Sequence, residues 1–241
     1  MIAAAALCPG PPLLARELTG QAEILPDLRH ACMVAVARLV AAAPDVIAVV
    51  GPADLTATWD PAGALDLTAY APALGRPAAP GAARTTSDGE RSALPLALGI
   101  GAALLDKAGW DGPRALWSVG GSAPQAECAR IGGDLEAPAE RIALLVMGDG
   151  SARRSVSAPG YLDERAEPFD AEVERAVRDG DLDALAALDP ALAADLMVSG
   201  RPAWQVLAAA LGGTGLRADV LYSDAPFGVG YLVAVFKMRD S

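Results

Sequence analysis

Histidine and cysteine, the side chains that most often bind transition metals in proteins, are scarce in this sequence. Its 241 residues include one histidine, His30, and three cysteines, Cys8, Cys32 and Cys128. The cysteines are odd in number and widely spaced, with no Cys-x-x-Cys pair, so neither a disulfide framework nor a zinc site is expected. His30 falls in a helical pattern, away from every loop that follows a predicted strand, and is expected to be a structural surface or half-buried residue.

Basic side chains are also few. Lys and Arg number 19 against 30 Asp and Glu, which gives a formal net charge of −11 at pH 7. Nucleic acid is therefore not expected as a partner, because contacts to phosphate require an excess of Lys and Arg. The same argument disfavours an anionic membrane surface, and the charge is expected to serve solubility.

Long apolar runs are missing as well. Stretches such as Ile142–Met147 and Val229–Phe236 are far shorter than the roughly 20 residues of a membrane-spanning helix. Met1–Leu7 is apolar, but no Lys or Arg precedes it and Pro-Gly-Pro-Pro follows in place of a small-residue cleavage site, which predicts a buried strand and not a signal peptide. The expected location is the cytoplasm, where the thiols would stay reduced.

The sequence does contain enough apolar residues for a large core, since 53% of them are hydrophobic. Short apolar runs predict strands at Ile2–Leu7, Val46–Val50, Leu65–Ala69, Ala115–Val119, Ile142–Met147, Ala218–Tyr222 and Gly230–Phe236. Helices are predicted at Asp27–Ala43, Ser92–Ala108, Pro124–Leu135, Glu167–Arg178, Leu182–Leu188, Ala191–Val198 and Ala203–Leu211. Without an interior linker, this alternation predicts one α/β domain over residues 1–241, with a central, mainly parallel sheet flanked by helices.

Ligands of such sheets bind outside the carboxyl ends of the strands. The segments that follow predicted strands are rich in Gly, Pro, Ser and Asp, and comprise Cys8–Pro12, Gly51–Asp54, Gly120–Ser122, Gly148–Ser151 and Tyr222–Pro226. Any binding site is expected in these loops.

An ordered set of short motifs runs along the chain. Cys-Pro-Gly-Pro-Pro occupies residues 8–12 and Gly-Pro-Ala residues 51–53, and Gly-Asp-Gly-Ser-Ala-Arg-Arg begins at Gly148. Ala-Pro-Gly-Tyr, Pro-Phe-Asp, Leu-Asp-Pro and Ser-Gly-Arg then follow in that order. The ordered set resembles the class III extradiol ring-cleavage dioxygenase superfamily, the LigB-like and Memo-like proteins. The resemblance covers most of the chain, implies a LigB-like α/β fold, and suggests a homodimer, since family members often pair.

The resemblance also implies that the family's iron site is missing. The two metal-binding histidines would fall at Gly10 and Ala53, the acid/base histidine at Ala152, and a further pocket histidine at Arg91-Ser92. The family's iron needs two imidazoles and one carboxylate, and imidazole also carries the proton transfers. Iron is therefore not expected as a cofactor, and Gly10, Ala53 and Ala152 are expected to face one cavity.

Carboxylates near the loops provide an alternative site. Asp54, Glu90, Asp149 and Asp224 could together bind Mg²⁺ or Ca²⁺, which prefer oxygen ligands. Taken singly, Asp149 and Asp224 suit turns, because an Asp side chain accepts hydrogen bonds from free backbone N–H groups.

Three further polar side chains complete the pocket candidates: Ser92, Ser151 and Tyr222. Cys8 adjoins the first loop, but no second histidine exists to lower its pKa, so a buried structural thiol is favoured over a nucleophile. Arg153, Arg154 and Arg165 could bind an anion, although pairing with the nearby acids is favoured.

Two functions follow from these residues. The first is a LigB-fold protein that is not a working dioxygenase and that has a binding or scaffold role for a small molecule at the strand-end pocket. The alternative is an enzyme that uses strand-end carboxylates, with or without a divalent cation, on a small substrate. A pocket completed by histidines of a partner chain is disfavoured, because the lost positions lie on this chain's own strand ends.

Overall fold

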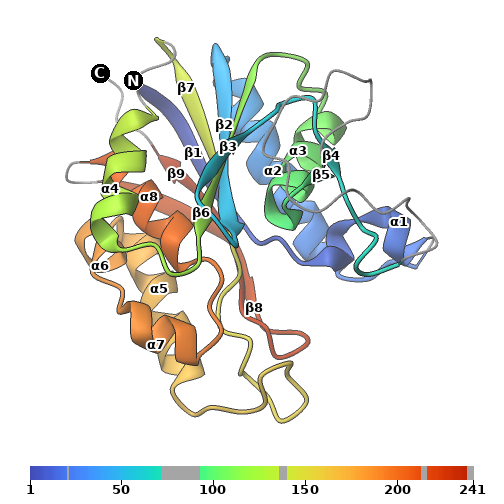
Figure 1. The fold of residues 1–241 in the computed structure, drawn as a ribbon, viewed down its shortest axis with the longest axis vertical. Coiled ribbons are helices and arrows are strands. Elements are labelled where there is room, and N and C mark those ends of the chain that lie inside the picture. Colours follow the sequence, from blue (N-terminus) through green and yellow to red (C-terminus); the bar gives the residue numbers. More distant parts are fainter. Residues whose placement is uncertain (21, 72–92, 136–139, 213–215, 238–241) are drawn as a thin grey trace.

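A sheet of seven strands organises the chain (Figure 1). The computed structural model describes residues 1–20, 22–71, 93–135, 140–212 and 216–237. In chain order the strands of this sheet are β1 (Ile2–Cys8), β2 (Val46–Ala53), β3 (Ala57–Trp59), β6 (Arg114–Gly120), β7 (Ile142–Met147), β8 (Arg217–Asp224) and β9 (Tyr231–Lys237). A separate pair, β4 (Ala64–Leu65) and β5 (Ala93–Leu94), lies outside the sheet.

The spatial order of the strands is β3-β6-β2-β7-β1-β9-β8. The central four strands pair in parallel, whereas β9 is antiparallel to both of its neighbours and β3 is antiparallel to β6. Two reversals make β8 run in the same direction as β1. The carboxyl ends of β1, β2, β6, β7 and β8 therefore share one edge of the sheet, and the expected α/β class with a mainly parallel sheet is confirmed.

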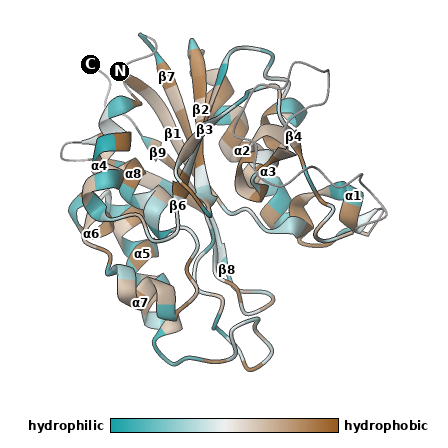
Figure 2. Cartoon of the chain, viewed as in Figure 1, coloured by the Kyte–Doolittle hydropathy of each residue, from teal (hydrophilic) through white to brown (hydrophobic). Residues whose placement is uncertain are grey.

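Helices cover both faces of the sheet and bury two apolar layers (Figures 1 and 2). One face carries α2 (Pro26–Ala41) and α3 (Leu96–Lys107), and the other carries α4 (Gln125–Asp134), α5 (Ala166–Asp179), α6 (Leu182–Ala186) and α8 (Arg201–Leu211). Three short helices, η1 (Pro12–Leu14), α1 (Arg16–Thr19) and α7 (Pro190–Asp195), complete the described elements.

Successive side chains of a strand alternate between the two layers, as the pleat requires. In β7, Leu144 and Val146 face the layer that contains α8, while Leu145 and Met147 face α2 and α3. Both faces of the strand are buried, which explains its uninterrupted apolar sequence. Within the described residues, no helix combines the length and the apolar character required to cross a membrane.

Three details of the sequence-based prediction were wrong. The short edge strand β3 was not predicted, and the strand expected at Leu65–Ala69 is confined to Ala64–Leu65. The helix expected from Ser92 begins only at Leu96. Pro95 explains this late start, because a proline disfavours the helical conformation of the residue before it, and Leu94 pairs in β5 instead.

Two glycines let β7 and α8 approach closely. A Cβ atom added to Gly148 would lie well under 3.0 Å from the backbone of Gly200, and one added to Gly200 would meet the ring of Trp204. Because the obstacle at Gly148 is backbone, no rotamer change could relieve it. The loop after β7 is thus seated directly on the first turn of α8.

Arg201 starts that turn and is almost entirely buried, with 2% of its surface exposed. Its guanidinium donates hydrogen bonds to the carbonyl oxygens of Gly121 at 2.6 Å and Ala123 at 2.7 Å, and to Oε1 of Gln205 at 2.8 Å. These bonds compensate a buried cation that would otherwise be strongly unfavourable, and they tie the loop between β6 and α4 to α8.

Gly148→Ala is therefore expected to lower the free energy of unfolding by roughly 1–3 kcal/mol, the usual effect of overpacking. Urea denaturation followed by circular dichroism measures the change. Gly133 in α4 is the matched control, because an added Cβ meets no atom within 4 Å there. Gly133→Ala should leave stability unchanged or raise it by up to about 1 kcal/mol through helix propensity. Equal denaturation midpoints for Gly148→Ala and the wild type would show that the close approach of the two backbones does not require glycine at position 148.

Candidate functional site

The loop Gly148–Ser151 lies at the centre of the carboxyl edge, because β7 is flanked by β2 and β1. Oδ1 of Asp149 accepts a hydrogen bond of 2.7 Å from the backbone N–H of Gly10. The N–H of Gly148 donates to the carbonyl oxygen of Cys8 at 2.9 Å. These two bonds join the loop after β7 to the loop after β1.

Asp170, on α5, holds the loop Gly148–Ser151 from the face of the sheet that α5 covers. Its Oδ1 accepts from the N–H of Ser151 at 2.9 Å, and its Oδ2 accepts from Arg154 at 3.2 Å. The N–H of Gly150 donates to the carbonyl oxygen of Gly230, which lies between β8 and β9, and the N–H of Gly230 donates to the carbonyl oxygen of Ser151. Both glycines lie so close to the Asp170 carboxylate that a Cβ atom on either would overlap with it. The side chain of Asp170 is 12% exposed, and its burial raises the pKa above the ordinary value.

Asp149 is the most perturbed acid at this edge. The side chain is half-buried, and loss of solvation raises its pKa to about 6, while the hydrogen bond from Gly10 partly opposes the shift. The negative charge of Asp149, together with burial, raises the pKa of Tyr231 well above its usual range. Burial and the charge of Asp224 do the same to a smaller extent for Tyr222. A row of polar groups thus extends from the end of β7 towards β8.

A pocket of about 260 Å³ opens at this edge between the β7 loop, α5 and the β8–β9 hairpin. Its charged lining consists of Glu167, Asp170, Glu174, Asp224 and Arg154, four acids against one base, for a net charge of −3. Arg154 lies 3.2 Å from Asp170 and 3.6 Å from Glu167. Glu174 accepts a hydrogen bond of 2.5 Å from Ser223 and also pairs with Arg178, which is not part of the lining. Four acids against these two arginines still leave the pocket with a net charge of −2.

The three residues predicted at histidine positions of the resembled superfamily lie at or beyond the ends of neighbouring strands. Gly10 follows β1, Ala53 ends β2 and Ala152 lies beyond β7. An added Cβ on Gly10 would stand 3.5 Å from Cα of Ala97, at the start of α3. Ala152 is buried, and its N–H donates to the carbonyl oxygen of Leu196 at 3.1 Å. That these positions face a single cavity stays a prediction.

The other candidates separate into different environments. Cys8 is fully buried, and a hydrogen bond with Cys32 together with burial raises its pKa well above the ordinary thiol value, so it is a poor nucleophile. Ser151 is also fully buried and donates from Oγ to the carbonyl oxygen of Leu196 at 3.1 Å. Glu90 and Ser92 lie outside the described residues.

Of the four acids proposed for Mg²⁺ or Ca²⁺, the three that the structure describes do not form a common metal site. Asp54 and Asp224 are exposed at separate loops, and Asp149 is bonded to Gly10. In the part of the chain that the structure describes, no three His, Cys, Asp or Glu side chains lie together as ligands for a metal ion.

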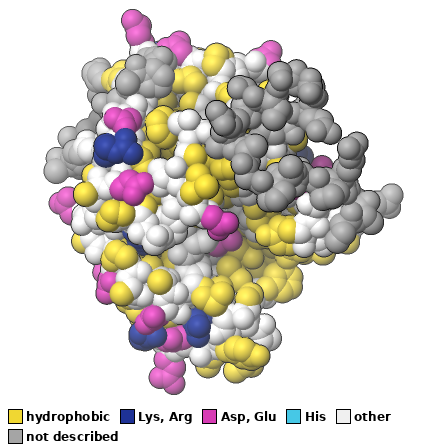
Figure 3. Space-filling model, in the orientation of Figure 1, with side chains coloured by type: hydrophobic (Ala, Val, Ile, Leu, Met, Phe, Trp, Pro, Cys, Tyr) yellow, Lys and Arg dark blue, Asp and Glu magenta, His cyan; other side chains and the backbone are white. Residues whose placement is uncertain are grey.

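Two of the three arginines near the β7 loop are paired, as the sequence favoured, whereas Arg153 takes part in no ion pair among the described residues and its buried Nε has no hydrogen-bond partner there. Arg154 lies against Asp170, and Arg165 contacts Asp163 at 2.8 Å and Asp195 at 3.3 Å. The Lys and Arg side chains that show clearly in Figure 3 likewise lie beside acidic ones. His30 is exposed on α2.

Sequence reasoning missed two features of this site. Asp170 was not singled out, although the Pro-Phe-Asp motif that contains it carried the family resemblance. The electrostatic influence of Asp149 on Tyr231 was also missed. It links the loop after β7 to β9, and these two strands pair with opposite sides of β1, so no local pattern signals it.

Comparisons with known proteins define the fold and nothing finer. No protein-family model and no curated protein sequence matches the chain. Among solved structures, the chain is similar to the uncharacterized protein JW3007 from Escherichia coli K12, with a TM-score of 0.56 and 16% sequence identity. The match covers 97% of this chain and 98% of that chain. At this identity the likeness shows a shared α/β fold.

The raised pKa of Asp149 gives a test of its environment. In the folded state its pKa is about 6, against 3.8 for an ordinary Asp, so the folded protein binds the proton more tightly than the unfolded chain. This group's contribution to stability is fully present below pH 3.8 and is lost as pH rises through about 6. Asp149→Asn removes the titration but keeps an oxygen that can accept the Gly10 hydrogen bond.

The unfolding free energy of Asp149→Asn relative to the wild type should therefore increase between pH 4 and pH 7, by at most about 3 kcal/mol. The value is an upper limit because the carboxyl keeps exposed surface. Urea denaturation at several pH values measures it, with Asp60→Asn as an exposed control. A difference between Asp149→Asn and the wild type that stays constant with pH would place the carboxyl in water.

Proposed function

We propose that the protein is an iron-independent member of the LigB-like fold, and that it binds a small organic cation at the carboxyl edge of its sheet. Three motif residues support this membership through the contacts they make. Asp149 joins the β7 loop to the Cys-Pro-Gly turn, Asp170 of the Phe-Asp motif holds the same loop, and Arg201 of the Gly-Arg motif anchors the loop after β6.

The side chains needed for the family's iron chemistry are replaced. Gly10, Ala53 and Ala152 carry no metal-binding atom in their side chains, and the one imidazole, His30, is exposed on α2. Fe(II) sites of the extradiol type need two imidazoles and a carboxylate with open coordination positions. The described carboxylates provide no substitute cluster, so a binding role fits the chain better than ring cleavage.

The acidic pocket is the observation that carries the proposal. It lies where ligands of open α/β sheets bind, outside the carboxyl ends of the strands. Its 260 Å³ accommodates about nine water-sized groups, since a water molecule occupies about 30 Å³ of liquid volume. Four carboxylates around one guanidinium favour a cation, and Val173, Trp204 and Leu232, which belong to the apolar layer on this face of the sheet, provide an apolar wall for its carbon skeleton.

Putrescine is a suitable probe of the pocket, and 1,4-butanediol is its neutral counterpart. Putrescine should raise the melting temperature in a saturable way, as a ligand selective for the folded state must, and butanediol should not. Asp224→Asn should weaken putrescine binding about tenfold in calorimetry, because it removes a charge-assisted contact. Among the described residues, Oδ1 of Asp224 accepts a hydrogen bond only from the N–H of Ala225, and an Asn side chain can keep that bond.

Asp60→Asn, at an exposed position away from the pocket, is the charge-matched control. Equal weakening in the two variants would attribute binding to overall negative charge. An equal rise in melting temperature with butanediol would show that the carboxylates do not contribute to binding.

The iron-independent part of the proposal has its own test. After anaerobic incubation with Fe(II) and desalting, the protein should retain much less than one iron per chain, and it should not cleave catechol or protocatechuate in air. Stoichiometric iron together with ring cleavage, both lost in Asp149→Asn, would show that a site without paired imidazoles performs this chemistry.

A further inference from the structure

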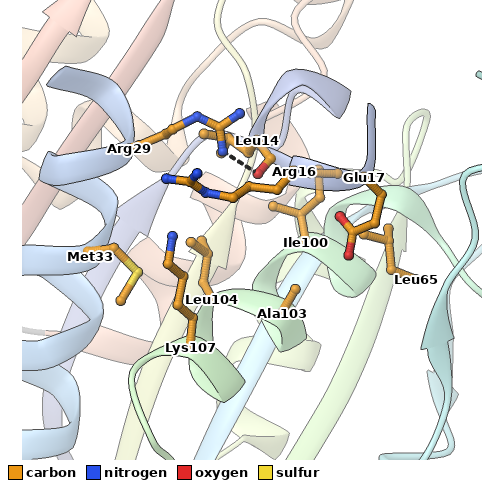
Figure 4. Close-up of a pocket in the computed structure, with 11 residues that line it drawn as sticks. Leu14, Arg16, Glu17, Arg29, Met33, Leu65, Ile100, Ala103, Leu104 and Lys107 are labelled. Atoms are coloured by element: carbon orange, nitrogen blue, oxygen red, sulfur yellow. Dashed lines mark hydrogen bonds between the residues drawn. The ribbon is translucent and has the colours of Figure 1, made fainter. Parts of the chain in front are cut away.

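A second cavity, of about 200 Å³, lies between η1, α1, α2 and α3 (Figure 4). Its apolar wall comes from four elements: Leu14 of η1, Met33 of α2, Leu65 of β4, and Ile100 and Leu104 of α3. The cavity belongs to the helical layer of α2 and α3, whereas the acidic pocket adjoins α5 on the other face of the sheet. The two cavities share no lining residue.

Basic side chains from three helices surround this apolar wall: Arg16, Arg29 and Lys107. In Figure 4 the guanidinium of Arg16 and the ammonium of Lys107 turn to the same side of the cavity, while the carboxylate of Glu17 turns towards Leu65. Glu17 is the one acid among the described lining residues, which together carry a net charge of +2 in a chain of net charge −11.

Arg29 is held rigidly at the cavity wall. Its guanidinium donates hydrogen bonds to the carbonyl oxygens of Ile24 at 2.9 Å and Leu14 at 2.7 Å, to that of Leu13, and to Oγ1 of Thr19 at 3.2 Å. These acceptors are all neutral, so they leave its charge uncompensated. Burial and the positive charge of Arg16 both lower the pKa of Arg29, as expected where two cations stand close together.

We propose that this cavity binds a small amphipathic carboxylate, with its hydrocarbon part against Ile100 and Leu104 and its carboxylate between Arg16 and Lys107. The volume of 200 Å³ corresponds to about seven water-sized groups, the size of a short fatty acid or a simple aromatic acid. The charge excess selects against a neutral amphiphile, and the apolar wall selects against an inorganic anion. This site is independent of the proposed function, because its lining is positive and would bind an anion, whereas the acidic pocket at the carboxyl edge would bind a cation.

Isothermal titration of the full-length protein tests the proposal with four probes. Hexanoate and benzoate present the carboxylate on an aliphatic and an aromatic body, and the tighter of the two identifies the source of the ligand. Hexanol lacks the charge and acetate lacks the apolar body. The expected result is saturable binding of hexanoate, benzoate or both, at least tenfold tighter than binding of hexanol or acetate. Comparable affinity for hexanol, or for acetate, would overturn the proposal.

Variants locate the site. The double variant Arg16→Gln with Lys107→Gln should weaken carboxylate binding at least tenfold, and both positions are exposed, so the fold should persist. Ala103→Leu fills the cavity from an exposed position on α3 with a good helix former, and should abolish binding. The double variant Arg130→Gln with Arg175→Gln, at exposed positions on α4 and α5, removes the same charge and should bind like the wild type.

Unchanged binding in both the double variant and Ala103→Leu would place the ligand elsewhere. Putrescine titration of the same variants separates the two proposals, because the double variant should retain its response to that cation. Loss of both responses in Ala103→Leu would indicate damage to the fold, and the double variant then decides the question alone.

Discussion

The loop Gly148–Ser151 is held by contacts that leave no room for larger side chains. Gly148 lies against Gly200, Asp149 is bonded to the loop after β1, and Ser151 is bonded to Asp170 of α5. One short segment thus fixes the relative positions of the central strand, the next strand along the sheet and two helices of one layer. The arrangement of the carboxyl edge depends on this segment, because both the loop after β1 and the turn between β8 and β9 are hydrogen-bonded to it.

The contacts of the motif residues explain how a chain can resemble an iron-dependent family without its ligands. Asp149, Asp170 and Arg201 bond to backbone groups, and Gly148 and Gly200 allow two backbones to meet. Such residues maintain loop geometry, since buried N–H and C=O groups must find partners. Under the proposed loss of iron, Gly10, Ala53 and Ala152 replace side chains that serve the metal site, and these small residues leave the loop contacts in place.

Charged side chains are distributed unevenly over the protein, and its net charge alone does not show this. The acidic pocket at the carboxyl edge carries −3, whereas the cavity between α2 and α3 carries +2. A net charge of −11 predicts avoidance of polyanions over the whole surface, but screening limits the reach of exposed charges to about 8–10 Å. A partly enclosed cavity is therefore governed by its own lining. Two ligands of opposite charge are compatible with one strongly acidic chain.

The amino-acid sequence by itself determined the fold class and the position of nearly every helix and strand, because apolar runs and helical spacing reflect burial within a single element. It also determined that the chain contains a single imidazole, but not the role of Asp149, which was expected to cap its own turn and instead accepts a hydrogen bond from Gly10 in the loop after β1. Tertiary structure decided which loops meet and which acids share a pocket. Asp170 and Asp224 lie on different elements, as do Arg16 and Lys107. It also decided the pKa of Asp149, because the burial of this carboxyl and its hydrogen bond from Gly10 exist only when the loops after β1 and β7 have met.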